Sequence, residues 1–351
     1  MSSSNVSTGL SVNLSTGEVQ SGHIQFRNRI INGDMRIAQR GTSTTTAGKT
    51  YLIDRFSTWT SITTGQLTTS QNTLTSSDLP YQFGFRYSNK LLVTTAVSSY
   101  LWVAPHQHIE GSHVSDLMWG TSYGSPVTLS FWLKTNATGQ HSIAIRSGAS
   151  GITNYNAILN ISVANTWDYY TFNIPAPPSG TTWAVDYTNG IEVFICPLFG
   201  TSKTTGWTSI DTYIGVTGSV NWPATLNNYI EFTGVQFEKG TKATPFEFRP
   251  YSFELQLCQR YYQIIATSFA ALADNSSSIL SSAYIYIVPL RTNPTPTITA
   301  INFSQPTIFD ILGVSSWVGV ANTYFIVRST NSASRSGMGL MGISGYVNAE
   351  L

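Results

Sequence analysis

The sequence predicts an all-β protein, in which an antiparallel jelly-roll β-sandwich is followed by a short helix and a smaller C-terminal β domain. The first reason is pattern: short stretches of alternating apolar and polar residues are separated by clusters of Gly, Ser, Asn and Pro. The second is composition, because Thr and aromatic residues favour pleated strands. Charged residues make up only 10% of the chain, against roughly 25% in an ordinary soluble domain. Short strands joined by frequent turns are typical of packed antiparallel sheets.

The clearest strand is predicted at residues 125–135, where apolar and polar residues alternate. The residues of its apolar face are Val127, Leu129, Phe131 and Leu133. Residues 141–147 and 167–175 alternate in the same way. Residues 191–199 are apolar at both odd and even positions, which indicates a strand covered on both faces.

The alternation slips once in the strand predicted at residues 229–240. Ile230 and Phe232 share one face, and Val235 and Phe237 then continue that face with the opposite parity. One extra residue restores the register, so a β-bulge is predicted at Thr233-Gly234.

A helix is predicted after the sandwich, within residues 250–263. Pro250 ends the preceding strand, Ser252 can cap the helix, and Glu254 suits its N-terminal end. One helical face would then carry Leu255, Cys258 and Tyr262. The predicted organisation is an extended arm at 1–27, the sandwich at 28–249, the helix at 250–263 and a C-terminal β domain at 264–351.

The two ends of the chain are expected to contact other molecules. Residues 1–27 are rich in Ser, Thr, Gly and Asn with scattered apolar residues, so they cannot bury a core alone. They are either a flexible leader or an arm that orders on a partner. Residues 264–351 combine many Tyr, Ile and Ser with few charges. Self-association around a symmetry axis, most simply as a homotrimer, would cover their apolar surplus.

Charge and cysteine content exclude several classes of protein. The net charge is +1 with no basic stripe, so no nucleic-acid partner is expected. No apolar run is long enough to span a membrane, and no cleavable signal is predicted. Cys196 and Cys258 are too few for a disulfide framework or a four-ligand zinc site.

The sequence does not show a paired set of catalytic groups. Carboxylates are scarce. Gly41 and Gly48 are too far apart for a phosphate-binding loop. We therefore expect a protein that is not an enzyme and has no cofactor.

The segment HQHIEGSHVSD has two interpretations. Its potential metal ligands are His106, His108, Glu110, His113 and Asp116. The favoured interpretation is the polar, exposed face of an edge strand, since no second shell is evident for a metal.

Tryptophans are the best candidates for a binding role. An aromatic ring stacks on the apolar face of a sugar, while amide and charged neighbours take its hydroxyl groups. Filling the ends of the sandwich or subunit contacts is the alternative for each one. The candidates for glycan binding are Trp102, Trp119, Trp132, Trp207 and Trp222.

The segment NRIINGDMRIAQRG, residues 28–41, gathers the charges that the rest of the chain lacks. Its isoleucines and methionine are expected to form a buried edge of the sandwich. Its charged residues are spaced for ion pairs at a seam between the sheets, with partners in the nearby DRF motif. The predicted seam residues are Arg29, Asp54 and Arg55. A structural role, in which this segment holds the domain together, is favoured over a catalytic one.

These segments resemble a bacteriophage tail-fibre and virion-surface family with a jelly-roll domain similar to carbohydrate-binding modules. The resemblance covers roughly residues 28–263 and rests on NRIINGDMRIAQRG, YLIDRFSTW and VQFEKGTKATPFEFRPYSFELQLCQRYYQ. It implies a virion location and binding to a host surface glycan. Residues 1–27 lie outside the resemblance and are expected to attach the chain to other virion proteins. A structural decoration or cement protein of the capsid or baseplate is the alternative, and an enzyme that degrades envelope polysaccharide is the third possibility.

The resemblance also implies an optional structural calcium, for which Asp34 and Glu231 are the candidate ligands. The family's acidic pair in the last strand is replaced here by Glu231 followed by Phe232. This departure argues against calcium.

Overall fold

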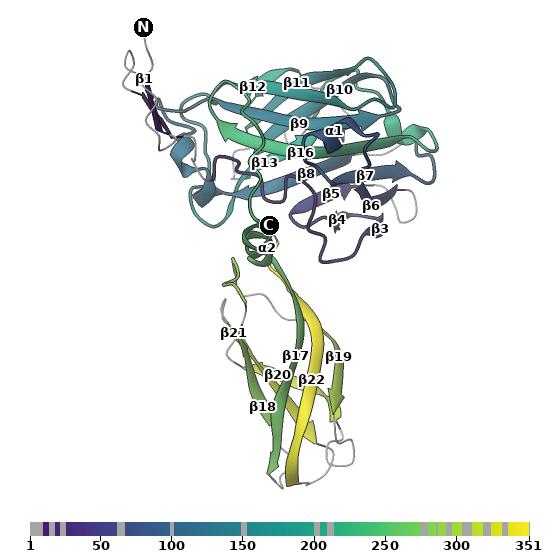
Figure 1. Cartoon of the computed structure of the whole chain (residues 1–351), viewed down its shortest axis with the longest axis vertical. Coiled ribbons are helices and arrows are strands. Elements are labelled where there is room, and N and C mark those ends of the chain that lie inside the picture. The colour runs from purple at the N-terminus through teal and green to yellow at the C-terminus, as the bar shows by residue number, and fades with distance from the viewer. Residues whose placement is uncertain are drawn as a thin grey trace.

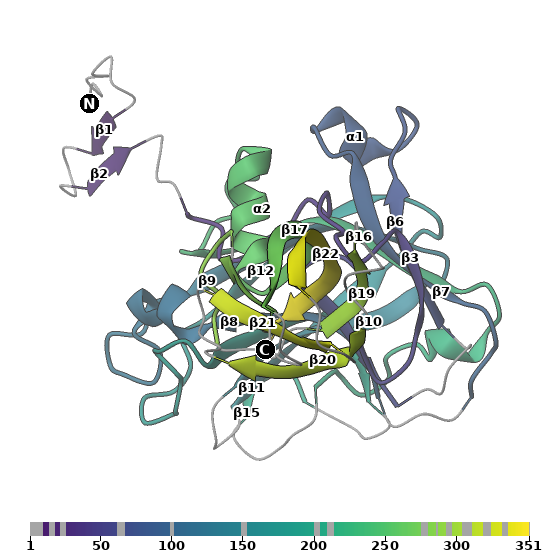
Figure 2. The same cartoon turned by 90° about the horizontal axis from the view of Figure 1, so that it is seen from below.

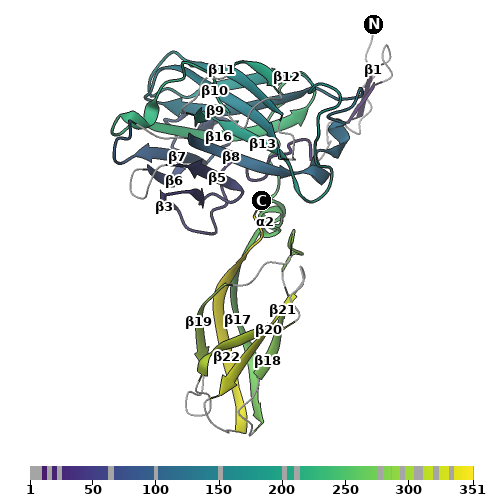
Figure 3. The same ribbon diagram turned by 180° about the vertical axis from the view of Figure 1, so that it is seen from behind.

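The computed structural model folds into two bodies, a broad β-sandwich and a narrower C-terminal module that projects from it (Figures 1 and 3). The N-terminal strands β1 (Leu10–Asn13) and β2 (Glu18–Ser21) pair in a sheet of their own. The structure describes residues 10–13, 18–21, 26–61, 67–98, 102–148, 153–199, 204–208, 214–274, 280–285, 287–292, 297–303, 311–318, 324–331 and 336–350. The rest of the predicted arm lies outside these residues.

The sandwich consists of two antiparallel sheets, as predicted. In the described residues, the first sheet has eight strands in the order β15-β11-β10-β13-β8-β5-β4, with β14 paired to β8. These strands are β4 (Lys49–Tyr51), β5 (Phe56–Thr60), β8 (Trp102–Glu110), β10 (Gly139–Ser147), β11 (Asn154–Ile161), β13 (Asn189–Ile195), β14 (Leu198–Phe199) and β15 (Gly206–Thr208).

The second sheet has six described strands in the order β12-β9-β16-β7-β6-β3. They are β3 (Ser43–Thr46), β6 (Leu67–Thr73), β7 (Tyr87–Val93), β9 (Val127–Thr135), β12 (Asp168–Ile174) and β16 (Tyr229–Lys239). The chain crosses between the two sheets repeatedly, from β5 to β6, β7 to β8, β8 to β9 and β9 to β10, which gives the jelly-roll type of connection. The crossings are accompanied by the short helix α1 (Leu79–Gln82) and by 3-10 turns at Gly111–His113, Ser115–Leu117 and Trp222–Ala224.

Alternation along the strands fills the space between the sheets. The predicted apolar face of β9 is at most 1% exposed and belongs to the main core. Phe56 of the first sheet meets Phe232 of the second with ring centroids 5.9 Å apart. The strand β13 is covered on both faces, as predicted, because its odd-numbered residues join this core while Phe194 packs in a smaller apolar cluster on the other face.

The predicted β-bulge is confirmed in β16. Thr233 pairs with Trp132 and Gln236 pairs with Ser130, so β16 has one more residue than β9 between these pairs. Gly234 adopts a φ of +64°, a conformation that favours glycine. The side chains of Phe85 and Trp132 also approach the site where its Cβ would lie.

The helix α2 (Tyr251–Gln259) leads directly into the C-terminal module. Pro250 is the N-cap residue, whereas Ser252 lies inside the helix, so the predicted serine cap is wrong. Tyr262 begins a strand and does not continue the helical face, because the helix ends at Gln259. No helix in the described part of the chain has the length and apolar character needed to cross a membrane.

The C-terminal module contains two three-stranded sheets in its described residues, ordered β17-β22-β19 and β18-β21-β20. Figure 2 shows them from below, along the projecting axis of the module. The strands are β17 (Tyr262–Asp274), β18 (Leu280–Ile285), β19 (Thr297–Phe303), β20 (Ile311–Val318), β21 (Tyr324–Asn331) and β22 (Ser336–Asn348).

Buried charges join the two bodies. Arg55 of the sandwich, 1% exposed, pairs with the carboxylate of Glu350 just beyond β22 and donates a 2.6 Å hydrogen bond to the His108 carbonyl. The guanidinium carbon of Arg55 lies 3.4 Å from the ring centroid of Tyr261. Glu110 of β8 accepts two hydrogen bonds from Arg260, 2.9 and 3.0 Å long. We call this set of contacts the joint.

Replacing Gly33 with alanine is expected to destabilise the sandwich. A Cβ at Gly33 would lie 2.2 Å from the Val235 carbonyl oxygen. The two residues approach closely because the Val235 amide donates a hydrogen bond to the Gly33 carbonyl. The resulting displacement should cost about 1–3 kcal/mol, measured as a lower midpoint of thermal or urea unfolding. Thr42→Ala, at an exposed residue of the same segment, is the control. Equal stability of the two variants would contradict this close approach.

Candidate functional site

The strand register brings charged and aromatic residues together on the outer face of the eight-stranded sheet. Strands β10, β13, β8 and β5 are neighbours, and their outward side chains lie opposite one another. Arg146 pairs across to Glu192, and Glu192 to His108. The charged–aromatic cluster consists of Trp59, Trp102, His106, His108, Arg146 and Glu192.

The polar half of the charged–aromatic cluster is a continuous chain of contacts. The guanidinium of Arg146 pairs with Glu192, and Glu192 Oε1 lies 3.2 Å from His108 Nδ1. The Nε2 atoms of His108 and His106 are 2.9 Å apart. His106 Nδ1 lies 2.8 Å from the carbonyl oxygen of Ala104, to which it donates because a carbonyl only accepts. These contacts hold both imidazole rings in fixed orientations.

Aromatic rings form the other half of the charged–aromatic cluster. Trp59 and Trp102 contact each other with ring centroids 5.1 Å apart, and Phe199 stacks on Trp102 at 6.2 Å. Arg146 lies over the Trp59 ring, 5.7 Å from its centroid. Both tryptophans are half-buried, and Lys49, whose strand pairs with that of Trp59, is exposed. A ligand at this face would therefore meet the partly exposed rings of Trp59 and Trp102 beside Arg146, whereas the buried groups behind them are out of its reach.

Burial controls the charges behind these rings. It lowers the pKa of His106 well below the usual value, and the neighbouring His108 adds to this effect. Burial also lowers the pKa of His108, although Glu192 opposes the shift. For Glu192 itself, burial is outweighed by His108 and Arg146, so its pKa lies far below the usual range. Burial therefore disfavours a charge on either imidazole, whereas Glu192 is ionised.

The structure corrects the interpretation of the segment that contains these histidines. The strand β8 lies between β13 and β5, so it is not an edge strand, and His106, His108 and Glu110 are at most 5% exposed. The alternative metal site is not assembled either. His113 follows in a separate turn, and Asp116 pairs with Arg29. In the described residues, no group of three or more His, Cys, Asp or Glu side chains could hold a metal ion.

Only one of the predicted tryptophans belongs to the charged–aromatic cluster. Trp102 is part of it, whereas Trp222 is fully buried in the core and offers no ring face to a ligand. Trp119 and Trp207 contact Trp183 with centroids 4.7 and 5.9 Å away, so they pack together and Trp119 fills the core instead of lying open. The predictions for Trp119 and Trp222 as platforms are wrong for this reason.

Trp132 is also buried, at 8% exposed, but it supports rings that are not. Phe83 and Tyr169 contact it with centroids 5.0 and 5.1 Å away. Trp132 packs in a small cluster outside the main core, and the prediction that its own ring is an open platform is wrong. Trp59, Arg146 and Glu192 were missed because their importance comes from neighbouring strands, which alternation within one strand does not reveal.

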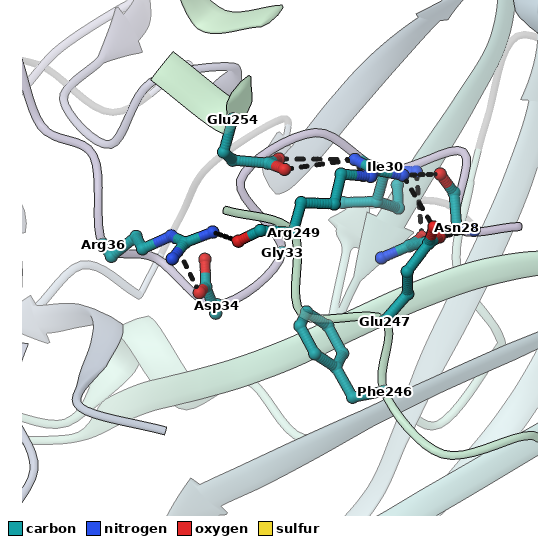
Figure 4. A pocket seen from close by; sticks show the side chains of 9 residues that line it. All are labelled: Asn28, Ile30, Gly33, Asp34, Arg36, Phe246, Glu247, Arg249 and Glu254. Carbon is teal, nitrogen blue, oxygen red and sulfur yellow. Dashed lines mark hydrogen bonds and ion pairs between the residues drawn. The ribbon is translucent and has the colours of Figure 1, made fainter. Parts of the chain in front are cut away.

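The segment 28–41 is a seam, as predicted, and it lies against the end of the sandwich chain and the start of α2. Figure 4 shows Asn28, Arg36 and Arg249 converging there. Asn28 Oδ1 accepts hydrogen bonds from the amides of Ile30 and Phe237, both 3.0 Å long. Arg249 pairs with Glu254 at 3.3 Å. These contacts connect the two ends of the sandwich chain.

A small polar hollow lies in the seam, lined by Asn28, Ile30, Gly33, Asp34, Arg36, Phe246, Glu247, Arg249 and Glu254 (Figure 4). It holds about 180 Å³ of space that includes open solvent, less than the ~300–1,000 Å³ of ordinary ligand pockets. Its charged groups already pair with one another. The hollow is therefore part of the seam and not a ligand site.

Each of the three predicted seam residues forms an ion pair with a different part of the chain. Arg29 pairs with Asp116 at 2.9 Å, and Asp54 with Arg40 at 3.6 Å. Arg55 turns instead to Glu350, beyond the sandwich. Burial raises the pKa values of Asp54 and Asp34, each to about 6.

Asp34 and Glu231 do not fit a calcium ion. Asp34 pairs with Arg36 at 3.1 Å. Glu231 accepts a 2.7 Å hydrogen bond from the Ser88 hydroxyl and lies 3.4 Å from Lys134 Nζ. Cations of the protein already occupy the positions that calcium would need, so the predicted ligand pair is wrong.

The fold is similar to several solved structures, although no protein-family model and no curated protein matches the chain. The enzymatically active domain of bacteriophage CBA120 tailspike protein 4 is 18% identical, with a TM-score of 0.32 over 61% of this chain and 22% of that chain. A CBM4 structure is 15% identical, with a TM-score of 0.25 over 44% of this chain and 71% of that one. The family 11 carbohydrate-binding module of a Clostridium thermocellum cellulosomal cellulase is 9% identical, with a TM-score of 0.29 over 56% and 98%. These are distant similarities of fold, without a family assignment.

Lowering the pH from 7 to 5 is expected to destabilise the histidine pair. The folded pKa values of His106 and His108 lie below the usual 6.5, so the unfolded chain binds protons first and stability is lost as the pH falls below about 6.5. Asp34 and Asp54 act in the opposite sense, because their raised pKa values add stability as the pH falls from about 6 to about 4.

Comparison with a His106→Gln/His108→Gln variant isolates the histidine contribution. The variant should be less stable at pH 7, since it loses the contacts with Ala104 and Glu192. The difference between the two unfolding midpoints should narrow towards pH 5, because only the wild type carries these groups. A difference that stays constant with pH would contradict the lowered pKa values of the buried histidines.

Proposed function

We propose that this chain is a non-catalytic virion-surface protein, of the tail-fibre or capsid-surface kind, that adheres to host surface glycans. The observation that carries this proposal is the half-exposed pair Trp59 and Trp102 next to Arg146 and Glu192. Aromatic rings bind the apolar face of a sugar, and the partly exposed Arg146 beside them can donate hydrogen bonds to its hydroxyls. The carbohydrate-binding-module-like sandwich is a frame that can present such a surface.

Adhesion is favoured over catalysis because the charges of the charged–aromatic cluster are already paired. Glu192 is held ionised between Arg146 and His108, so it is a poor general acid. A hydrolase of the glycosidase kind needs a second carboxyl group at catalytic spacing. The network instead holds Arg146 in place beside the tryptophan rings.

The virion role includes two partners. Residues 1–27 attach the chain to other virion proteins, and residues 264–351 hold a homotrimer. The resemblance of residues 28–263 to phage tail-fibre proteins supports the virion location. No nucleic acid or membrane insertion has a part in it.

Replacing both tryptophans, as Trp59→Ala/Trp102→Ala, is expected to weaken binding to host glycans. Loss of two stacking rings should reduce affinity about tenfold or more, which is ~1.4 kcal/mol. A glycan array and binding to whole host cells measure the effect. Tyr123→Ala, which removes a ring that is 77% exposed elsewhere, is the control. Undiminished glycan binding by a folded double variant would contradict the assignment of this site.

Deleting residues 1–27 is expected to prevent incorporation into virions while the sandwich still folds. Incorporation is measured by detecting the chain in purified particles, and folding by the thermal midpoint of the isolated protein. Normal incorporation of the shortened chain would rule out attachment through the arm. Particles that lack the chain but remain infectious and become fragile would favour a decoration role over adhesion.

A further inference from the structure

A second aromatic surface lies on the outer face of the six-stranded sheet, the sheet opposite the charged–aromatic cluster. Three of its rings are exposed: Phe83 at 56%, Phe248 at 47% and Tyr169 at 44%. We call this the aromatic patch. Such exposure is unusual for large apolar side chains that are grouped together, and it marks a binding surface more often than chance.

The rings of the aromatic patch are held in place from below. Phe83 and Tyr169 lie against Trp132 at interplanar angles of 39° and 47°. Phe248 contacts the buried Phe85 with centroids 5.1 Å apart. Phe85 and Trp132 belong to one small core cluster above the bulge at Gly234. The exposed rings are therefore positioned before a ligand arrives, which reduces the entropy lost on binding.

Charges beside the aromatic patch compensate one another. Asp78 Oδ1 accepts a 2.8 Å hydrogen bond from Trp167 Nε1 and lies 3.2 Å from Lys134 Nζ. Lys134 is also 3.4 Å from Glu231. Arg86 lies over the ring of Tyr81, 4.0 Å from its centroid. The surface thus offers rings and hydrogen-bonding groups but little net charge.

We propose that the aromatic patch is a second saccharide-binding surface, specific for uncharged sugars, so that one chain holds two glycan segments on opposite faces of its sandwich. Ring faces at an angle to each other suit an extended chain of sugars better than a single flat group. Asp78 holds Trp167 and Lys134 in place at the edge of the aromatic patch. Hydrogen bonds from Thr75, Trp167 and Lys134 outweigh burial and lower the pKa of this carboxyl to about 2, so it remains an acceptor at any physiological pH. This inference rests on the proposed function only in the class of ligand, a glycan, and concerns a different surface.

Two sites on one chain would raise binding to a polymer well above the affinity of either site. Once one segment is bound, the second binding event becomes intramolecular, with an effective concentration set by the ligand between the faces. Long polysaccharides should therefore bind much more tightly than short oligosaccharides of the same sugar.

The test uses the full chain, a soluble neutral β-glucan and its carboxymethylated derivative as probes. Affinity electrophoresis measures retention, and calorimetry with a short neutral oligosaccharide measures the number of sites. We expect two sites per chain in the wild type, and one in Phe83→Ala/Tyr169→Ala, with at least a threefold loss of retention on the neutral polymer. Carboxymethylation should weaken binding at the aromatic patch. Tyr123→Ala is the control for the loss of an exposed ring.

Comparison with Trp59→Ala/Trp102→Ala separates this inference from the proposed function. If that variant retains one site and the patch variant retains the other, both proposals stand. If only the patch variant loses binding, the aromatic patch is supported and the charged–aromatic cluster is not. Unchanged retention by a folded patch variant, checked with single Tyr169→Ala, overturns the inference. Lost self-association or virion incorporation with unchanged sugar binding also overturns it, and would identify a protein interface.

Discussion

The burial of Arg55 is the constraint on which the two-body architecture depends. An unpaired guanidinium in the interior costs several kcal/mol, and the sandwich alone offers this one a carbonyl oxygen. The ring of Tyr261, between α2 and β17, and the carboxylate of Glu350, just beyond β22, complete its surroundings. The sandwich and the module therefore complete each other electrostatically, and neither surface of the joint is suited to exposure in water.

The same alternation that fills the core also creates both outer surfaces. Every second residue of β8, β10 and β13 faces away from the core. The strand register places the paired side chains of Arg146, Glu192 and His108 beside partly exposed tryptophans. On the opposite sheet, the bulge at Gly234 makes room for Phe85 and Trp132, which in turn support exposed rings. A domain with few charges thus concentrates its chemistry on two faces, each stabilised from inside.

The parts of the fold that depend on local pattern could be predicted from the sequence. The apolar face of β9, the bulge at Thr233-Gly234 and the helix after Pro250 each follow from residues a few positions apart. The pairing of strands could not be predicted in this way, and it decides the candidate site. Arg146 and Glu192 are 46 residues apart, and Arg55 and Glu350 are 295 apart. The burial of individual tryptophans could not be predicted either, because the residues around a tryptophan in the sequence do not show whether its ring lies in the core or on the surface.

The joint has a mechanical consequence. A flexible linker would let the C-terminal module swing, and a pull on it would first straighten the linker. Here β17 begins three residues after α2 ends, and ion pairs to Arg260 and Glu350 brace the connection on both sides. A tug at the distal tip is consequently transmitted as torque to the sandwich, so the direction in which the saccharide-facing sheets point is set by the orientation of the tip.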